Sequence, residues 1–340
     1  MKVLVLAGGD SSEREVSFTS GKAVLETLVQ LGHTVHAVDP ATGASLLTAE
    51  GKFIESDDSS DKKLPKTQSG LRLVSRLNDA DLKDIDVVFI ALHGGSGENG
   101  SCQSLLELAG VTYTGSSMAA CAVSMDKAIT KRLCRSEGIL TPQWELYRLA
   151  DGVIPDNLAE IITQRFTLPV VVKPNDSGST VGLTKVEQSA EINGALQSAL
   201  KESTNVLVEQ FIPGRELTVA VLDGRSFPII EIVPESGLYD YEAKYTNGKS
   251  EYICPAVIPA SVADAVRRAA VKLFEVIGCA GLARIDFILD EDGRFYCLEL
   301  NSVPGMTDLS LAPMAAKADG IDFPQLMQML LESALDRSAK

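Results

Sequence analysis

The sequence predicts an α/β protein of two or three domains, parallel at its N-terminus and with antiparallel α+β elements further on. The length supports the domain number, since the chain has 340 residues and a domain typically has roughly 100–200. The chain opens with an apolar strand, a helix and a second strand, the order of a parallel βαβ unit. Near the C-terminus, two apolar runs flank Asp292-Gly293, a dipeptide typical of a tight β-hairpin turn.

The composition excludes several classes of function. Hydrophobic residues make up 45% and charged residues 23% of the chain, which is ordinary for a globular protein. The net charge of -15 argues against nucleic acid or an anionic membrane as the main partner. Nucleotide binding stays open because it needs only a local group of cations. The six cysteines lack CxxC spacing, and the chain shows neither a signal-peptide pattern nor an apolar run of membrane-spanning length, so we expect a cytoplasmic protein.

The first elements are a strand over residues 2–7, a glycine-containing turn, and a helix that ends before Gly32. Ser12 and Glu15 have the spacing of a capping box. Without a GxGxxG motif, a dinucleotide site is not supported. Glu13 has two interpretations. It either stabilises the helix dipole as a first-turn acid or points into a cleft and holds an ammonium group.

The next informative stretch follows the apolar strand predicted over residues 86–92. Residues 93–100 read His-Gly-Gly-Ser-Gly-Glu-Asn-Gly and precede a helix. Backbone N–H groups in such a turn suit an anion or a carboxylate, although a tight turn without a ligand gives the same pattern. His93 at the strand's end favours a site. Residues 40–83 form an irregular surface excursion.

Two lysines stand out in the middle of the chain. Lys127 lies near the start of a helix predicted over residues 124–137 and, taken alone, is a solvated helix lysine. Lys173 ends the apolar strand 168–174 and needs a partner, for which a phosphate is suitable. The polar loop 175–182 could lie over phosphates, although it lacks the P-loop pattern. Residues 236–250 are rich in Tyr, Lys and Gly and predict an ordered loop or lid.

The hairpin suggests a metal site. If Asp292 and Gly293 form a two-residue loop, Asp286 faces Glu299 on one face of the hairpin, and Arg284 faces Asn301 beside them. Facing carboxylates repel each other unless a divalent cation lies between them, and carboxylate and amide oxygens are ligands that Mg²⁺ prefers. A three-residue loop would not keep this register. The alternative is a charged, solvated outer face.

Taken in order, these motifs resemble the D-alanine–D-alanine ligases, which are members of the ATP-grasp superfamily. The resemblance extends over essentially the whole chain, through Ser-Ser-Glu13-Arg-Glu-Val-Ser, His93-Gly-Gly-Ser-Gly-Glu-Asn-Gly, Ser124-Met-Asp-Lys127, Val172-Lys173-Pro, Tyr241-Glu-Ala-Lys244-Tyr245, Arg284-Ile-Asp286 and Glu299-Leu-Asn301-Ser-Val-Pro-Gly-Met-Thr. It implies a three-domain ATP-grasp fold with an N-terminal α/β domain (1–117), a central subdomain (118–205) and a C-terminal subdomain (206–340) that carries the lid loop 236–250. ATP would lie between the last two.

The resemblance also implies a reaction and its participants. ATP phosphorylates the carboxylate of one D-alanine, and the amine of a second D-alanine displaces phosphate, which gives D-alanyl-D-alanine for peptidoglycan precursors. Two Mg²⁺ ions, which Mn²⁺ could replace, would neutralise the phosphates. A homodimer is implied as well.

The implied roles fall into three groups. ATP would be bound by Lys127, Lys173, Ser179, Glu209, Phe211, Ile212, Glu216 and Lys244. The metal ligands would be Asp286, Glu299 and Asn301. Glu13 and His93 would bind the first D-alanine, Gly305 and Ser310 the acyl intermediate and the second D-alanine, and Ser179, Tyr245 and Arg284 would complete the catalytic set.

Two small departures from the family pattern are Asn99, where Asp is expected, and Ser302, where Thr is expected. Other functions stay open. A ligase that uses D-lactate or D-serine is one, although Tyr245 in the lid favours the dipeptide. A catalytically silent nucleotide-binding protein is another, and a Rossmann oxidoreductase is a distant third.

Overall fold

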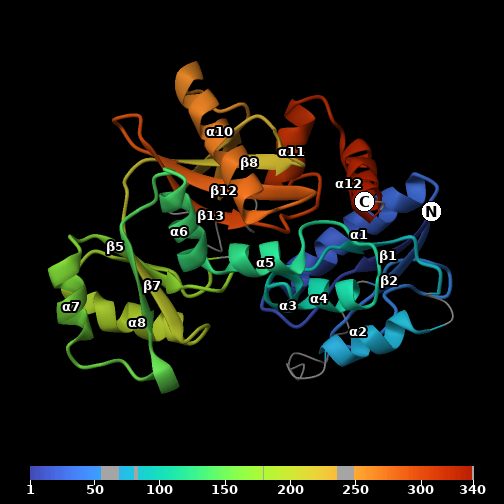
Figure 1. The fold of residues 1–340 in the computed structure, drawn as a ribbon, viewed down its shortest axis with the longest axis horizontal. Coiled ribbons are helices and arrows are strands. Elements are labelled where there is room, and N and C mark those ends of the chain that lie inside the picture. The colour runs from blue at the N-terminus through green and yellow to red at the C-terminus, as the bar shows by residue number, and fades with distance from the viewer. Residues whose placement is uncertain (55–68, 80–82, 179, 236–248, 339–340) are drawn as a thin grey trace.

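The structure is a computed structural model that describes residues 1–54, 69–79, 83–178, 180–235 and 249–338 (Figure 1). Three sheets organise the chain, and Figure 1 shows them as three lobes with helices around them. Each sheet has its own buried apolar cluster, and the cluster behind the first sheet continues into the third.

The N-terminal sheet is parallel and has the strand order β2-β1-β3. Its strands are β1 (Lys2–Leu6), β2 (Thr34–Val38) and β3 (Val87–Ile90). Around it lie the helices α1 (Arg14–Gln30), α2 (Ser69–Leu77), α3 (Gly95–Glu98) and α4 (Ser101–Leu108). Every residue of β1 after Lys2 is fully buried, as expected for a parallel strand covered on both faces.

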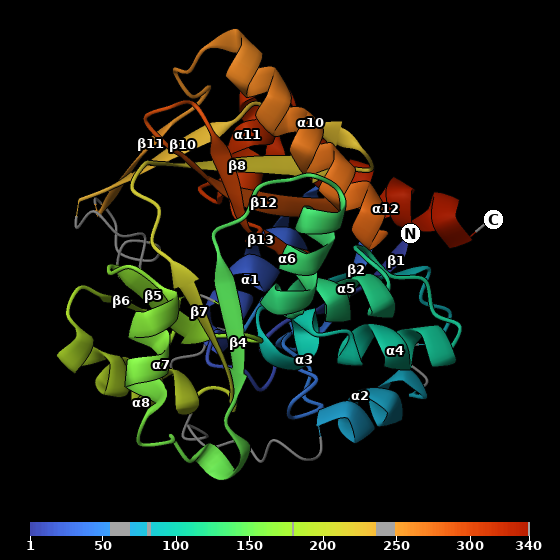
Figure 2. The ribbon, with the colours of Figure 1, turned by 60° about the vertical axis from the view of Figure 1, so that its left-hand side comes forward.

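The central sheet is antiparallel and has the order β4-β7-β5-β6 (Figure 2). Its strands are β4 (Trp144–Arg148), β5 (Val170–Pro174), β6 (Thr184–Val186) and β7 (Asn205–Gln210). They are covered by α7 (Leu158–Arg165) and α8 (Ile192–Leu200), with 3-10 segments η2 (Ala150–Gly152) and η3 (Ser189–Glu191) between them. The predicted domain division at residue 205 cuts through β7, so a division after Gln210 fits the sheets better.

The C-terminal sheet has the order β11-β10-β8-β12-β13, with β9 paired to β8. Its strands are β8 (Arg215–Leu222), β9 (Arg225–Ser226), β10 (Ile230–Pro234), β11 (Ser250–Ile253), β12 (Leu282–Leu289) and β13 (Phe295–Asn301). The helices that accompany it are α5 (Met118–Met125), α6 (Lys127–Ser136), α10 (Ala260–Ile277), α11 (Leu311–Ala318) and α12 (Phe323–Ser338). Helices α5 and α6 pack on β13, whereas α12 returns to pack on α1 and β3.

Several local predictions can be compared with this structure. The helix expected over residues 124–137 is two helices, because Asp126 ends α5 and caps α6. The predicted capping box is wrong. Helix α1 starts at Arg14, and its N-cap residue Glu13 makes no side-chain cap. Within the excursion 40–83, α2 is a helix that the sequence analysis did not predict. In the part of the chain described, no helix is long and apolar enough to cross a membrane.

Candidate functional site

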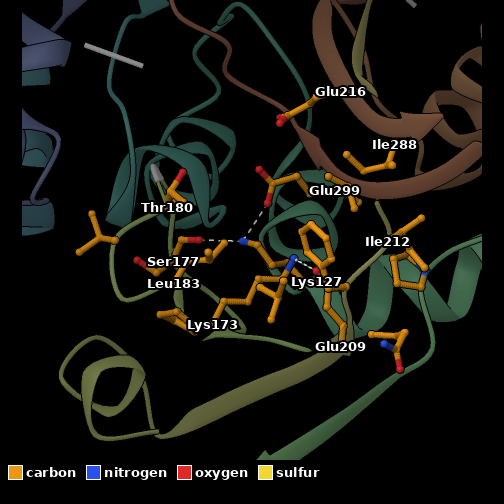
Figure 3. Close-up of a pocket in the computed structure, with 18 residues that line it drawn as sticks. Lys127, Lys173, Ser177, Thr180, Leu183, Glu209, Ile212, Glu216, Ile288 and Glu299 are labelled. Atoms are coloured by element: carbon orange, nitrogen blue, oxygen red, sulfur yellow. Dashed lines mark hydrogen bonds and ion pairs between the residues drawn. The ribbon is translucent and has the colours of Figure 1, made fainter. Parts of the chain in front are cut away.

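A cavity lies between the central and the C-terminal sheets (Figure 3). We call it the inter-sheet cavity. Its lining combines lysines and carboxylates with apolar and small polar residues. Its walls are Lys127, Pro142, Val171, Lys173, Pro174, Ser177, Gly178, Thr180, Val181, Leu183, Glu209, Gln210, Phe211, Ile212, Glu216, Ile288, Leu298 and Glu299. Most of the residues to which the resemblance assigns ATP binding therefore share one cavity.

Lys127 enters this cavity because of how α6 begins. The Asp126 carboxylate accepts a hydrogen bond from the Ile129 N–H at 2.9 Å, which caps the helix. Lys127 is then the first residue of α6, and its side chain is only 9% exposed. Its ammonium group donates to the Ser177 carbonyl at 2.7 Å and lies 3.3 Å from Glu299 Oε2 (Figure 3). The alternative of a solvated helix lysine is therefore wrong.

Glu209 lies between two buried lysines. The Lys173 ammonium donates to Oε1 at 2.5 Å, and the Lys131 ammonium lies 2.7 Å from Oε2. Burial raises the pKa of the Glu209 carboxyl, but the two lysines outweigh it and the net shift is downward. Burial likewise lowers the pKa of Lys173, but Glu209 and Glu299 outweigh it and raise that pKa overall. This part of the cavity is therefore a network of paired charges.

Lys131 is a member of this network that the sequence analysis missed. It is fully buried, and burial lowers its pKa although Glu209 opposes the shift. The one signal in the sequence is its spacing from Lys127, which the family motif assigns to the site. Lys127 and Lys131 are four positions apart on one helix, so they lie on the same face.

The hairpin of β12 and β13 brings the predicted carboxylates together. Asp286 is paired with Glu299, and Arg284 with Asn301, so the predicted pairing is confirmed. The predicted two-residue loop is wrong, because Asp290 and Arg294 close a loop of residues 291–293. A β-bulge at Leu298 shifts the register back between Asp286 and Phe287.

Asp286 is held by its neighbours in the sheet. Arg284 donates to both carboxylate oxygens of Asp286, at 3.0 and 2.9 Å. Thr218, which faces Asp286 from β8, donates its hydroxyl to Oδ1 at 2.6 Å. The Asn301 amide oxygen accepts from the Val303 N–H at 3.0 Å. Thr218 is a further residue that the sequence analysis missed, because only the strand order places it beside the hairpin.

These oxygens fit a divalent cation by their chemistry. Asp286, Glu299 and Asn301 are hard oxygen donors at one end of a hairpin. The described residues contain no group of three or more His, Cys, Asp or Glu side chains with metal-site geometry. We accordingly expect that a metal ion here would use the amide oxygen of Asn301 besides the two carboxylates, and this ligand set stays a prediction.

A second cluster surrounds Glu13 at the edge of the N-terminal domain. The Glu13 side chain is buried, and its Oε2 atom lies close to the backbone of both Gly94 and Gly178. A Cβ atom would come within 2.5 Å of this oxygen at Gly94 and within 2.6 Å at Gly178. Because Gly178 also lines the inter-sheet cavity, the Glu13 cluster and that cavity are adjacent.

His93 connects this cluster to the C-terminal part of the chain. Its Nε2 atom lies 2.9 Å from the Ser20 hydroxyl, which also accepts from the Met306 N–H at 3.3 Å. On its other side, Nδ1 lies 3.5 Å from the buried carboxylate of Glu98. The helix α1, the segment after β3 and the 302–307 turn are thus joined by one chain of polar contacts.

Ser310, the N-cap residue of α11, lies against Gly305 of this turn. The Ser310 hydroxyl accepts from the Thr307 N–H at 3.1 Å and lies 2.9 Å from the Thr307 hydroxyl. A Cβ at Gly305 would lie 2.9 Å from the Ser310 hydroxyl oxygen, so the two residues are in close contact. Three predicted site residues, Ser179, Lys244 and Tyr245, lie outside the described residues.

Two antiparallel sheets with lysines and carboxylates between them, beside an N-terminal α/β domain, are the architecture of the ATP-grasp fold. Fold and site together define an enzyme of this class, in which the sheets enclose a nucleotide.

The comparison with known proteins narrows the class. Family models described as D-ala D-ala ligase N-terminus and C-terminus match residues 2–116 and 133–332. The D-alanine–D-alanine ligases of Syntrophotalea carbinolica and Aquifex aeolicus are 41% and 40% identical to the chain, over 98% and 97% of it and 96% and 100% of their own lengths. The crystal structure of the Bacillus anthracis ligase complexed with ATP superposes with a TM-score of 0.77 at 28% identity, and covers 100% of this chain and 99% of its own. The chain belongs to the D-alanine–D-alanine ligase family, whose members are carboxylate–amine ligases.

Proposed function

We propose that this protein joins two D-alanine molecules at the expense of ATP. In the first step, a carboxylate oxygen of one D-alanine attacks the γ-phosphorus of ATP, and the bond to ADP breaks. In the second step, the amine of another D-alanine attacks the acyl carbon, phosphate leaves, and the amine loses a proton. Phosphorylation is needed because a carboxylate has no usable leaving group. Names of relatives at about 40% identity over the full length support the proposal.

One observation supports the particular reaction within this enzyme class, namely the position of Gly178. Gly178 touches the Glu13 carboxylate on one side and lines the inter-sheet cavity on the other. An ammonium group bound by Glu13 would therefore belong to an amino acid beside the nucleotide phosphates. Such proximity is what phosphoryl transfer to a carboxylate requires.

For the nucleotide, we assign the phosphates to Lys127 and Lys173, together with Lys244 from the lid. Both described lysines lie in the inter-sheet cavity, and Lys127 already contacts a carboxylate. Glu209 would accept a hydrogen bond from the exocyclic amine of adenine, while Phe211 and the backbone of Ile212 border the base. Glu216, which lines the same cavity, would bind the ribose hydroxyls.

For the metals, Asp286, Glu299 and Asn301 would hold two Mg²⁺ ions, or Mn²⁺. When bound, they would neutralise charge on the β- and γ-phosphates. Arg284 pairs with Asp286, beside the proposed metal ligands, and would stabilise the transferring phosphoryl group.

For the amino acids, Glu13 would bind the ammonium group of the first D-alanine, and His93 would orient it. Ser310 would hold the carboxylate of the second D-alanine, and backbone N–H groups near Gly305 would stabilise the acyl intermediate. Ser179 and Tyr245 would connect the two loops above the site and exclude water, which would otherwise hydrolyse the acyl phosphate. The homodimer, the cytoplasmic location and the division into three domains stay predictions.

ADP release measured with D-alanine, with L-alanine and with no amino acid tests this function. We expect release that depends on D-alanine, together with formation of the dipeptide. ATP turnover that ignores D-alanine would contradict it, and so would a protein that binds ATP without turnover, which is the silent alternative. Product analysis with D-lactate present near neutral pH separates the depsipeptide ligase, because predominant depsipeptide would overturn the choice of substrate.

Glu13→Gln tests the binding of the first D-alanine. Since the amide keeps the shape but removes the negative charge, we expect the KM for the first D-alanine to rise at least about tenfold while the KM for ATP changes little. An effect confined to ATP would mean that Glu13 is wrongly assigned.

A further inference from the structure

The further inference concerns Lys131, to which neither the resemblance nor the comparisons give a role. Its side chain is fully buried on the inner face of α6. A buried lysine is costly unless its ammonium group is paired and hydrogen-bonded. What its ammonium group contacts therefore shows what the residue does.

The Lys131 ammonium donates a hydrogen bond to the Thr141 hydroxyl at 2.9 Å. That hydroxyl in turn donates to the Cys297 carbonyl at 2.8 Å. The ammonium group is thus anchored between the segment before β4 and strand β13. The anchor leaves the ammonium group 2.7 Å from Glu209 Oε2.

The geometry of this ion pair leaves an acceptor open. Lys131 Nζ lies 2.7 Å from Glu209 Oε2, yet among the described residues this oxygen has no hydrogen-bond partner. The other oxygen, Oε1, accepts from Lys173. A buried carboxylate oxygen that is neutralised but not hydrogen-bonded is ready to accept a hydrogen bond from a ligand.

We propose that Lys131 is a positioning residue for base recognition. It neutralises Glu209 beside Oε2 without occupying that oxygen, so that Oε2 accepts a hydrogen bond from the exocyclic amine of adenine. The inference rests on the proposed function, in which Glu209 reads the base. A purine with a carbonyl at the same position, such as hypoxanthine, would present an acceptor to an acceptor and be rejected.

The measurement is the affinity for ADP and for IDP, obtained by calorimetry with the full chain. This readout does not depend on ligase activity. For Lys131→Met, we expect both oxygens of Glu209 to turn towards Lys173, so that the preference for ADP over IDP falls about tenfold, the minimum effect of losing a hydrogen bond to a charged group. A merely structural role would weaken the binding of both nucleotides equally, and an unchanged ratio would overturn the proposal.

Thr141→Val is the second variant, and it keeps the buried charge. Without the hydroxyl, the ammonium group loses its anchor, so it is able to shift onto Oε2 and compete with the base amine. We expect the ratio to fall in the same direction, and this variant tests the proposal even if Lys131→Met does not fold. An unchanged ratio here would contradict the role of the anchor.

Two further variants separate the possible failures. Lys272→Met is the matched control, because Lys272 also pairs with a carboxylate near the end of α6, that of Glu137 at 3.0 Å, but lies outside the inter-sheet cavity. The preference of this variant for ADP over IDP should equal that of the wild-type protein. If Glu209→Gln lowers the ratio whereas both Lys131→Met and Thr141→Val leave it unchanged, the role of Lys131 is refuted and base reading by Glu209 stands. If Glu209→Gln leaves it unchanged, both are refuted. Failure of the ligase assignment appears separately, as ADP release by the wild-type protein without D-alanine dependence.

Discussion

Gly178→Ala would test whether the Glu13 cluster and the inter-sheet cavity act together. The added methyl group would lie 2.6 Å from Glu13 Oε2, whereas ordinary contact begins at 3.4 Å. The nearest atom belongs to the far end of a flexible side chain, so the Glu13 carboxylate moves and the backbone stays in place. The required movement is about 0.8 Å, the difference between these two distances.

A displacement of this size is large for a group that positions a substrate. A misplacement of about 1 Å can reduce the rate about a hundredfold. We therefore expect kcat/KM for D-alanine to fall about 10- to 100-fold, while the melting temperature stays close to that of the wild type. The KM for ATP should change less, because the lysines and Glu209 lie on other elements.

The assay is ADP release at saturating ATP with D-alanine varied, together with a thermal melt. Gly194→Ala in α8 is the matched control, since nothing lies within 4 Å of its added methyl group. It should leave activity unchanged and stabilise the helix by up to about 1 kcal/mol. Glu13→Asp in the Gly178→Ala background shortens the displaced side chain. The loss of kcat/KM caused by Glu13→Asp should therefore be smaller in this background than in the wild-type protein. A Gly178→Ala enzyme within twofold of wild-type kcat/KM would refute the reasoning.

Three further predictions concern the metal site, closure of the lid over the nucleotide, and the acid stability of the buried charge network. Glu299→Gln removes charge shared by both predicted metals, so turnover at saturating ATP should fall at least about a hundredfold, and an enzyme that keeps most of its activity would contradict the hairpin site. Tyr245→Phe should raise ATP hydrolysis without peptide formation, measured as the ratio of ADP to dipeptide, and unchanged coupling would refute closure by the lid. Because the two lysines hold the pKa of Glu209 below its ordinary value of 4.5, the ionised carboxylate stabilises the folded protein. This stabilisation is complete above pH 4.5 and is lost as the pH falls through the lowered pKa of the folded state. Glu209→Gln should therefore make the melting temperature less sensitive to acid below pH 4.5, and an acid limb as steep as that of the wild type would show that this carboxylate is not responsible.

The N-terminal domain was the most predictable part of the fold. Strand β1 and helix α1 follow from an apolar run and a helical pattern that ends at Gly32, whose φ of 82° is one that glycine adopts readily. The start of α1 was less predictable, because several polar residues before Arg14 are acceptable N-caps and the tertiary contacts of Glu13 decide among them. Such local signals give the existence of an element more reliably than its ends.

The candidate site was predictable only where a motif marked it. Lys173 ends an apolar strand, where a charged side chain needs a partner, whereas Lys127 was assigned to the site only through the family motif that contains it. Lys131 lies within a helix whose pattern is equally consistent with an exposed lysine, so its burial depends on the packing of α6 against β13. Thr218 becomes part of the site only because β8 lies beside β12, and strand order between distant segments is not encoded locally.

The hairpin shows how a correct prediction of residue pairing can follow from an incorrect prediction of the loop. Asp292-Gly293 favours a two-residue loop, but the loop spans residues 291–293, and with this loop alone Leu298 would face Asp286. The bulge at Leu298 restores Glu299 to that position. It also allows Leu298 and Glu299, which are consecutive in the chain, to line the same cavity, whereas consecutive residues of a regular strand face opposite sides. The extra residue therefore adds an apolar wall beside the predicted metal ligands, and nothing in the local pattern of β13 marks it, because a bulge is recognised by its partner strand and not by its own residues.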